Sequence, residues 1–389
     1  MFFQSIGRSV RKGIPGGLRR AGLALVLSAA VAAPLAQAGN GGGLAQAIAE
    51  TIAALQASGQ KTQAAIMQIE AQTQAALGKI IGQSGGSLGG ALQETIDNLT
   101  LVLQESNSSY LAPTTGTTSF SATVTVDGAV RTYYVVRPQP ATQNAPMLIL
   151  MHAHGITPQT MANLARAGRL AQDYGVWVFL PVGENQTWNE DPSSLSKVDD
   201  VGFISAMIDA AVSQYGIDQK RVYAAGYSAG GFMAERLGCQ LSQKIAGFVA
   251  VSATLRDSLA TASECTPSHA MPAAFMDGTS DFVVPYKGEP TVESAAAATA
   301  FWAVQNTCVA NQTTTTTLPQ QVKDGTTVAL TRFTQCPADA AAALYTINGG
   351  GHTWPDSPDS IYTAYLGTTT QNLDATIALW QFLTPYSLP

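Results

Sequence analysis

The sequence predicts an α/β protein whose mostly parallel β-sheet is covered by helices on both faces. From about residue 120 to the end, short and fully apolar segments alternate with amphipathic helical segments. A glycine-rich turn at residues 226–230 connects one apolar segment directly to a helical one. Strands without a polar face are typical of sheets that are buried on both sides, and the intervening helices are the usual crossovers between parallel strands.

Two strand-like segments at 119–126 and 130–137 are joined by Asp127-Gly128, and this turn predicts an antiparallel hairpin. Apolar runs then predict strands at 147–151, 176–180, 222–225, 248–252, 273–276 and 344–347. Helical spacing of apolar residues predicts helices at 159–174, 199–215, 229–238, 292–306 and 371–382. Two hairpin strands and six parallel strands predict an eight-stranded sheet. Residues 311–318 and 328–334 are expected to form a separate surface hairpin.

Composition excludes several classes of protein. The chain has 389 residues, of which 46% are hydrophobic and only 12% charged, so it can bury a large core and is not intrinsically disordered. No basic patch occurs beyond the extreme N-terminus, and nucleic acid is therefore excluded as a partner.

The first 38 residues have the layout of a secretory signal peptide. Basic residues without any acidic residue precede the apolar run 21–33, and Ala36-Gln37-Ala38 supplies a small-residue cleavage site. The run is shorter than the ~20 apolar residues that a membrane span needs, so we expect no span after signal removal. The protein is therefore predicted to be secreted, into either the extracellular space or the periplasm.

Residues 39–112 are predicted to form a small helical segment and a linker ahead of a catalytic domain at 113–389. The segment is rich in Ala and Gln, and its apolar residues recur at mostly helical spacings. Two interpretations stay open. The helices either attach the protein to a surface or to a second copy of itself, or they form a mobile spacer.

The most specific local signal is Gly226-Tyr227-Ser228-Ala229-Gly230, which follows a predicted strand and precedes a predicted helix. This context is the nucleophile elbow, in which glycines permit a tight turn that lifts the serine above the sheet. The N–H of Ala229, at the start of the helix, would stabilise an oxyanion. Together with the strand order, the elbow predicts an α/β-hydrolase fold with Ser228 as nucleophile.

A serine nucleophile needs a general base and an acid, which follow it in the order acid, then histidine, on this fold. His352 lies in a glycine-rich loop after the last predicted strand and is the expected base, whereas His269 precedes a strand and lies at the wrong end. Asp277 and Asp281 both qualify as the acid. Asp281 is favoured because it lies on the loop that can reach His352, where it would fix the imidazole tautomer.

The loop after strand 147–151 reads His152-Ala153-His154-Gly155 and is expected to supply a second oxyanion donor, the N–H of Ala153 or His154. His152 is expected to brace this loop. Neither histidine is spaced from a Cys, Asp or Glu as a metal ligand would be, so no metal and no cofactor are predicted.

Four cysteines, Cys239, Cys265, Cys308 and Cys336, allow three disulfide pairings in an exported protein. The pairing of Cys239 with Cys265 and of Cys308 with Cys336 is preferred because it closes two short loops. Their spacing does not suit a zinc site.

The chain resembles the esterase family that contains extracellular poly(3-hydroxybutyrate) depolymerases and related feruloyl and acetylxylan esterases. The resemblance extends in order from about residue 124 to 383 and rests on residues 148–155, Trp188, 198–203, 221–233, Cys239, 277–281, 284–286, Trp302, Cys308 and 349–355. It implies Ser228, Asp281 and His352 as a catalytic triad and supports the two local disulfides. It also suggests that Trp188 and Asp199-Asp200 shape or brace the site, although a helix N-cap is the preferred interpretation of the aspartates.

One residue departs from the family pattern. Ala153 stands where the family usually has glycine, and its Cβ would exclude a positive φ at this position. The geometry of the second oxyanion donor therefore depends on the backbone at Ala153.

The predicted function is a secreted serine esterase that hydrolyses an aliphatic polyester, such as poly(3-hydroxybutyrate), or its oligomers through an acyl-enzyme. The alternative is a feruloyl or acetylxylan esterase acting on plant cell-wall polysaccharide. Tyr227, Trp188 and Trp354 are the expected substrate-binding residues, since their rings could stack on a sugar or feruloyl group. A non-catalytic binding protein is the hypothesis from a different class, and an intact triad argues against it.

Overall fold

The computed structural model describes residues 105, 107–261, 265–358 and 361–389. They belong to one unit, Gln104–Pro389. The predicted signal peptide and almost all of the predicted N-terminal helical segment lie outside the described residues. Within the described part of the chain, no helix combines the length and the apolar character that crossing a membrane requires.

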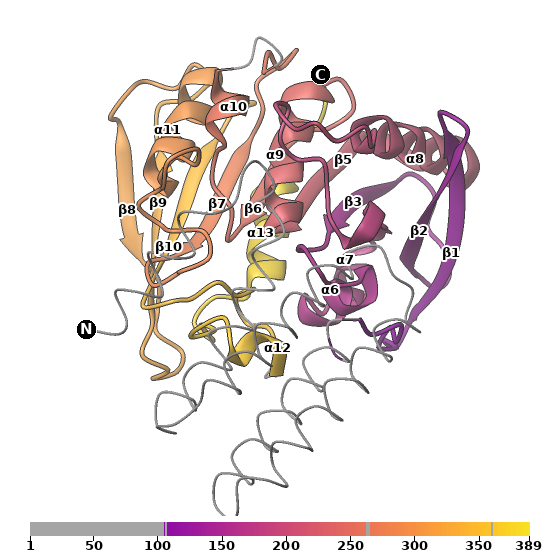
Figure 1. Ribbon diagram of the computed structural model, residues 1–389, viewed down its shortest axis with the longest axis horizontal. Helices are drawn as coiled ribbons and strands as arrows, with labels where there is room; N and C mark the ends of the chain where they lie inside the picture. Colours follow the sequence, from indigo (N-terminus) through magenta and orange to yellow (C-terminus); the bar gives the residue numbers. More distant parts are fainter. Residues whose placement is uncertain (1–104, 106, 262–264, 359–360) are drawn as a thin grey trace, which may run out of the picture. The chain divides into compact units, whose positions relative to one another are not determined.

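A single sheet of ten strands organises this unit, in the order β1-β2-β4-β3-β5-β6-β7-β10-β9-β8. Figure 1 shows it from β8 on the left to β1 on the right. The strands are β1 Thr117–Val126, β2 Ala129–Pro138, β3 Ala145–Met151, β4 Trp177–Pro181, β5 Ile217–Tyr227, β6 Phe248–Val251, β7 Ala273–Gly278, β8 Thr313–Thr317, β9 Thr327–Phe333 and β10 Ala342–Asn348. The six strands from β4 to β10 in the middle of this order are parallel, and each outer pair is antiparallel.

The predicted class and the mostly parallel sheet are confirmed, but the prediction of eight strands is wrong. The hairpin β8–β9 joins the same sheet, because β9 pairs antiparallel with β10 through Ala343 and Arg332. All five residues of β8 are exposed threonines. Such a polar edge strand carries no apolar signal, so its membership of the sheet depends on the pairing alone.

The helices cover both faces of the sheet. The long helices α8 Asp200–Tyr215, α9 Ala229–Gln240 and α11 Ala295–Gln305 share one apolar cluster with β3, β5, β6 and β7. The helices α6 Pro158–Leu164, α7 Gly168–Tyr174 and α13 Ala375–Leu383 form the other layer (Figure 1). The short elements η2 Glu184–Gln186, α10 Asp257–Ala260 and α12 Ile361–Ala364 lie in the loops.

Helix boundaries follow local chemistry. Asp199, Ser294 and Asp374 cap α8, α11 and α13 by accepting an N–H from the first turn. The helix predicted at 159–174 is divided into α6 and α7, because Arg166 has a φ of 47° and interrupts the helical backbone.

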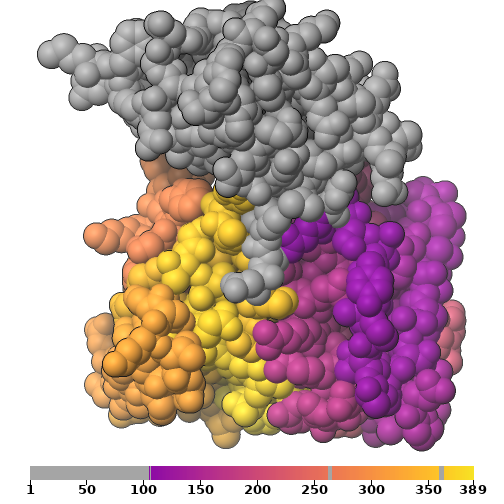
Figure 2. Space-filling model, turned by 90° about the horizontal axis from the view of Figure 1, so that it is seen from below, coloured from indigo at the N-terminus to yellow at the C-terminus, as the bar shows by residue number. Residues whose placement is uncertain are grey.

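The central strands are buried throughout, as fully apolar runs require. All residues of β3, β4 and β6 are buried. Figure 2 shows the C-terminal residues, in yellow, at the surface between the orange residues of the β8–β9 region and the indigo and magenta residues of the other half. Helices on both sides hold the parallel strands in place. The loops that follow the carboxyl ends of these strands carry the candidate site.

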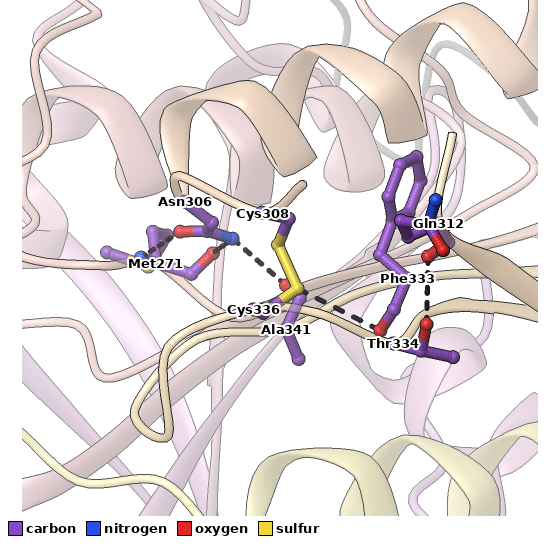
Figure 3. The surroundings of a disulfide bond; sticks show 8 residues. All are labelled: Met271, Asn306, Cys308, Gln312, Phe333, Thr334, Cys336 and Ala341. Atoms are coloured by element: carbon purple, nitrogen blue, oxygen red, sulfur yellow. Dashed lines mark hydrogen bonds between the residues drawn. A yellow bond between two sulfur atoms is a disulfide. The ribbon is translucent and has the colours of Figure 1, made fainter. Parts of the chain in front are cut away.

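Both predicted disulfides are present. Cys239 on α9 bonds Cys265, and Cys308, just after α11, bonds Cys336, just after β9. In Figure 3, the amide of Asn306 donates to the carbonyls of Met271 and Ala341 beside the second disulfide. This disulfide therefore joins the edge hairpin to α11 at a point where the backbone is already held by hydrogen bonds.

Candidate active site

The predicted site residues all follow the carboxyl ends of parallel strands. Ser228 follows β5, and the loop that begins at His152 follows β3. Asp281 lies on the loop after β7, and His352 lies on the loop after β10. Because β3, β5, β7 and β10 run in the same direction, these four loops meet at one edge of the sheet.

Ser228 sits on a strained turn. Its φ of 55° and ψ of −119° are outside the regions that side chains ordinarily adopt. A Cβ atom on Gly226 would lie 2.1 Å from the carbonyl oxygen of Gly230, and one on Gly230 would lie 2.3 Å from that of Met151. Only glycine fits at either position. The turn thus presses the start of α9 against the end of β3 and leaves Ser228 half-buried at the tip.

The structure brings Asp281, and not Asp277, to the imidazole. Nδ1 of His352 donates to Oδ2 of Asp281 across 2.7 Å, and both side chains are almost fully buried. The other carboxylate oxygen of Asp281 accepts the N–H groups of Val283 and Val284, each at 2.8 Å. With Nδ1 carrying the hydrogen, Nε2 of the neutral ring is the nitrogen that can accept a proton.

Tyr227, the residue before Ser228, holds His352 at the elbow. Its hydroxyl donates to the carbonyl oxygen of His352 across 2.5 Å, and the two rings lie 5.4 Å apart. Trp354 packs its edge against Tyr227 and donates its Nε1–H to Thr376. The chain neighbour of the candidate nucleophile therefore fixes the candidate base.

The aromatic residues predicted to bind substrate are buried. Tyr227, Trp354 and Trp188 are 0%, 1% and 3% exposed. Their rings pack against the loops that carry the site, which favours a bracing role over direct stacking on a substrate. Phe282, the residue after Asp281 in the chain, is by contrast 47% exposed.

His152 braces the loop expected to hold the second oxyanion donor. Its Nδ1 donates to the carbonyl of Ala153 and its Nε2 accepts the N–H of Gly183. Burial lowers the pKa of His152 to about 4, so the ring is neutral. Trp188 packs on this ring, 4.8 Å between centroids, and donates to the carbonyl of His152.

The backbone of Ala153 accommodates its Cβ. Ala153 is not among the residues with positive φ, whereas Gly155, two residues later, has a φ of 79°. The departure from the family's usual glycine therefore introduces no backbone strain at this position. Because a Cβ on Gly230 would also come within 2.7 Å of the carbonyl of His152, this loop lies directly beside the start of α9, as two converging oxyanion donors require.

A buried ion pair, missed from the sequence, holds the loop that carries Trp188. Arg131 on β2 donates to Oδ1 of Asp200 across 2.7 Å and stacks on the ring of Phe203. Oδ2 of Asp200 accepts the N–H of Asn189, next to Trp188. Asp199 is the N-cap of α8 as expected, and Asp200 lies in the first turn of the same helix, where it also makes the ion pair. No local pattern could have revealed Arg131, because it lies 69 residues from its partner.

Several known proteins are similar to this chain in sequence. Residues 189–317 match the phospholipase/carboxylesterase family model. The chain is 31% identical over 223 residues to feruloyl esterase B of Piromyces equi, a match that covers 54% of this chain and 39% of that protein. It is 31% identical over 127 residues to the bifunctional acetylxylan esterase/xylanase XynS20E of Neocallimastix patriciarum, covering 32% of this chain and 18% of that protein.

A third relative is matched over most of its length. NocK of Nocardia uniformis subsp. tsuyamanensis, which is named as a candidate esterase, is 24% identical over 294 residues, or 70% of this chain and 84% of that protein. The chain spans well under two thirds of the feruloyl esterase and of the acetylxylan esterase/xylanase. The chain is therefore similar, over parts of its length, to proteins that are named as esterases.

Proposed function

We propose that the protein is a secreted carboxylic ester hydrolase with Ser228, Asp281 and His352 as its catalytic triad. The observations that carry this proposal are the strained turn at Ser228 and the buried histidine–aspartate pair, which the hydroxyl of Tyr227 ties to that turn through the carbonyl of His352. A serine that served only as a turn residue would not need this strain.

The geometry supports acyl transfer in two halves. Oγ of Ser228 attacks the ester carbonyl carbon while Nε2 of His352 takes the hydroxyl proton, and Asp281 stabilises the imidazolium. The N–H of Ala229 and that of Ala153 or His154 stabilise the oxyanion. His352 returns the proton to the departing alkoxide, which leaves as the alcohol. Water then attacks the acyl-serine by the same route and releases the carboxylic acid.

For the substrate, we propose an ester of plant cell-wall polysaccharide, feruloyl or acetyl, ahead of an aliphatic polyester. The relatives named as feruloyl and acetylxylan esterases support this order. Phe282, which follows Asp281 in the chain and is half-exposed, would suit a feruloyl group. A polyester such as poly(3-hydroxybutyrate) remains the second candidate, because the sequence motifs resemble those of its depolymerases.

One set of assays tests both levels of this proposal. Purified wild type, Ser228→Ala and the matched surface control Ser213→Ala are compared on p-nitrophenyl acetate, methyl ferulate, acetylated xylan and a poly(3-hydroxybutyrate) suspension. We expect Ser228→Ala to lose all but a residual activity, about 10³-fold or more, and Ser213→Ala to match the wild type. Ester hydrolysis by Ser228→Ala at the wild-type rate would refute the triad. Release from the polyester alone would reverse the substrate order.

Export is proposed on the predicted signal peptide together with the two disulfides, which persist in oxidising compartments. N-terminal sequencing of the secreted protein would find Gly39 as the first residue if cleavage follows Ala38. An attachment or self-association role for residues 39–112 stays a prediction.

A further inference from the structure

A short segment ahead of β1 makes contacts that the proposed mechanism does not use. Residues 107–112, at the end of the predicted linker, form hydrogen bonds to α6 and to η2. All six residues are half-buried or exposed, and Tyr110 is 63% exposed. We call these residues the strap. Burial of apolar side chains contributes little to its position, which is therefore set mainly by hydrogen bonds.

Polar side chains on one face of α6 bind the backbone of the strap and of the chain just ahead of it. They lie three residues apart, at positions 157, 160 and 163. The side-chain amide of Asn163 donates to the carbonyl of Tyr110 and accepts the N–H of Ala112, each across 2.8 Å. Two further bonds come from hydroxyl groups, from Thr157 to the carbonyl of Ser108 across 2.6 Å and from Thr160 to that of Glu105 across 2.8 Å.

One side chain of the strap reaches a second element. Oδ1 of Asn107 accepts a side-chain N–H of Gln186, the last residue of η2, across 2.7 Å. Gln186 has a φ of 56°, and Asn185 before it has a φ of 54°. Two successive residues other than glycine in the left-handed region persist only where their surroundings hold them. The strap is part of what holds this turn.

The same two elements hold the loop that is expected to supply the second oxyanion donor. The carbonyl of Gln186 accepts the N–H of Gly155 across 2.8 Å. Gly183, just ahead of η2, donates its N–H to Nε2 of His152 across 3.0 Å. The two candidate donors lie between His152 and Gly155, and α6 follows this loop in the chain. The strap therefore binds together both elements that support the candidate donors.

We propose that the strap is a positioning segment for the oxyanion site, because its bonds to α6 and η2 set where the N–H of Ala153 or His154 points. Such a donor acts only at hydrogen-bonding distance from the oxyanion, and a misplacement of about 1 Å can cost about 100-fold in rate. A strap that only anchored the chain ahead of β1 would contribute stability and leave turnover unchanged. The assignment rests on the proposed function, since it takes this loop to supply an oxyanion donor.

The first test measures kcat and KM separately on p-nitrophenyl acetate. The double variant Asn107→Ala/Asn163→Ala removes three of these hydrogen bonds and leaves residues 152–155 unaltered. Asp218→Ala is the matched control, because it removes two hydrogen bonds from a half-buried turn at the amino end of β5, away from the site. We expect kcat of the double variant to fall about tenfold with KM within about twofold of the wild type, and Asp218→Ala to keep both values.

A conservative variant separates the hydrogen bond from the mere presence of the segment. Asn107→Asp keeps an oxygen that can accept the N–H of Gln186 and should match the wild type, whereas Asn107→Ala should lose about threefold in kcat. These single variants decide the matter by the same criterion if the double variant does not fold. A kcat of the double variant within twofold of the wild type, or an equal loss in Asp218→Ala, would overturn the proposal.

A second measurement needs no substrate and separates a failure of this proposal from a failure of the proposed function. Amide hydrogen exchange over residues 153–157, which include the N–H that Gln186 accepts, should be about tenfold faster in the double variant, and exchange over residues 222–227 of β5 should be unchanged. Unchanged exchange over residues 153–157 would overturn the proposal whatever the activity of Ser228→Ala. Faster exchange together with an active Ser228→Ala would support the hold on the loop and refute the proposed function alone.

Discussion

His152 makes the fold sensitive to acid through a single buried ring. The imidazole accepts one backbone N–H at Nε2 and donates at Nδ1 to the carbonyl of Ala153, so it must stay neutral to keep both contacts. In the unfolded chain its pKa is near 6.5, and in the folded protein burial lowers it to about 4. As the pH falls below 6.5, the unfolded chain takes up a proton that the folded protein refuses, and stability is lost.

The magnitude follows from these two values. The free energy of unfolding should fall by about 2 kcal/mol between pH 7 and pH 5, and by about 3 kcal/mol by pH 4, through this residue. Replacement of His152 by Gln removes the titrating group and keeps an acceptor for the N–H of Gly183. The variant loses the stacking on Trp188, so we expect it to be less stable than the wild type at pH 7.

Urea unfolding of the wild type and His152→Gln at pH 7, 6 and 5 measures the effect. Other groups titrate over this range in both proteins, so the difference between the two slopes isolates His152. The difference in the free energy of unfolding between the wild type and His152→Gln should narrow by about 2 kcal/mol from pH 7 to pH 5. A gap that stayed constant with pH would show that the ring is protonated or exposed in the folded protein and would refute the geometry given for this loop.

Three further outcomes are expected. Gly230→Ala places a methyl group 2.3 Å from a carbonyl of β3, so thermal unfolding should show a loss of about 2–3 kcal/mol together with lower esterase activity; unchanged stability would contradict the tight elbow. Asp200→Asn leaves Arg131 buried without its partner and should cost about 3 kcal/mol in urea unfolding, part of which the double variant with Arg131→Met regains. Replacement of Cys308 and Cys336 by Ala should cost about 3.5 kcal/mol under oxidising conditions and nothing under fully reducing ones.

Much of the fold could be predicted because its signals are local. The apolar runs of β3, β4 and β6 and the capping aspartates at Asp199 and Asp374 need only neighbouring residues to be recognised. The edge strand β8 could not be counted in the sheet, because five exposed threonines pair through backbone hydrogen bonds that any polar strand could form. The split between α6 and α7 was also missed, since the positive φ of Arg166 follows from packing and not from its own preference.

The sequence by itself determined the elbow at Ser228, the chain order of serine, acid and histidine, and the preferred disulfides, because motif, order and loop length are properties of the chain. Only the tertiary structure decided that Asp281 holds His352, that Asp277 is buried, and that Arg131 pairs with Asp200. The physical reason is that a side chain's partner and its access to water depend on segments that are distant in sequence. Trp188 illustrates the point, since a tryptophan near a predicted site suggested substrate binding until its burial against His152 gave it a different role.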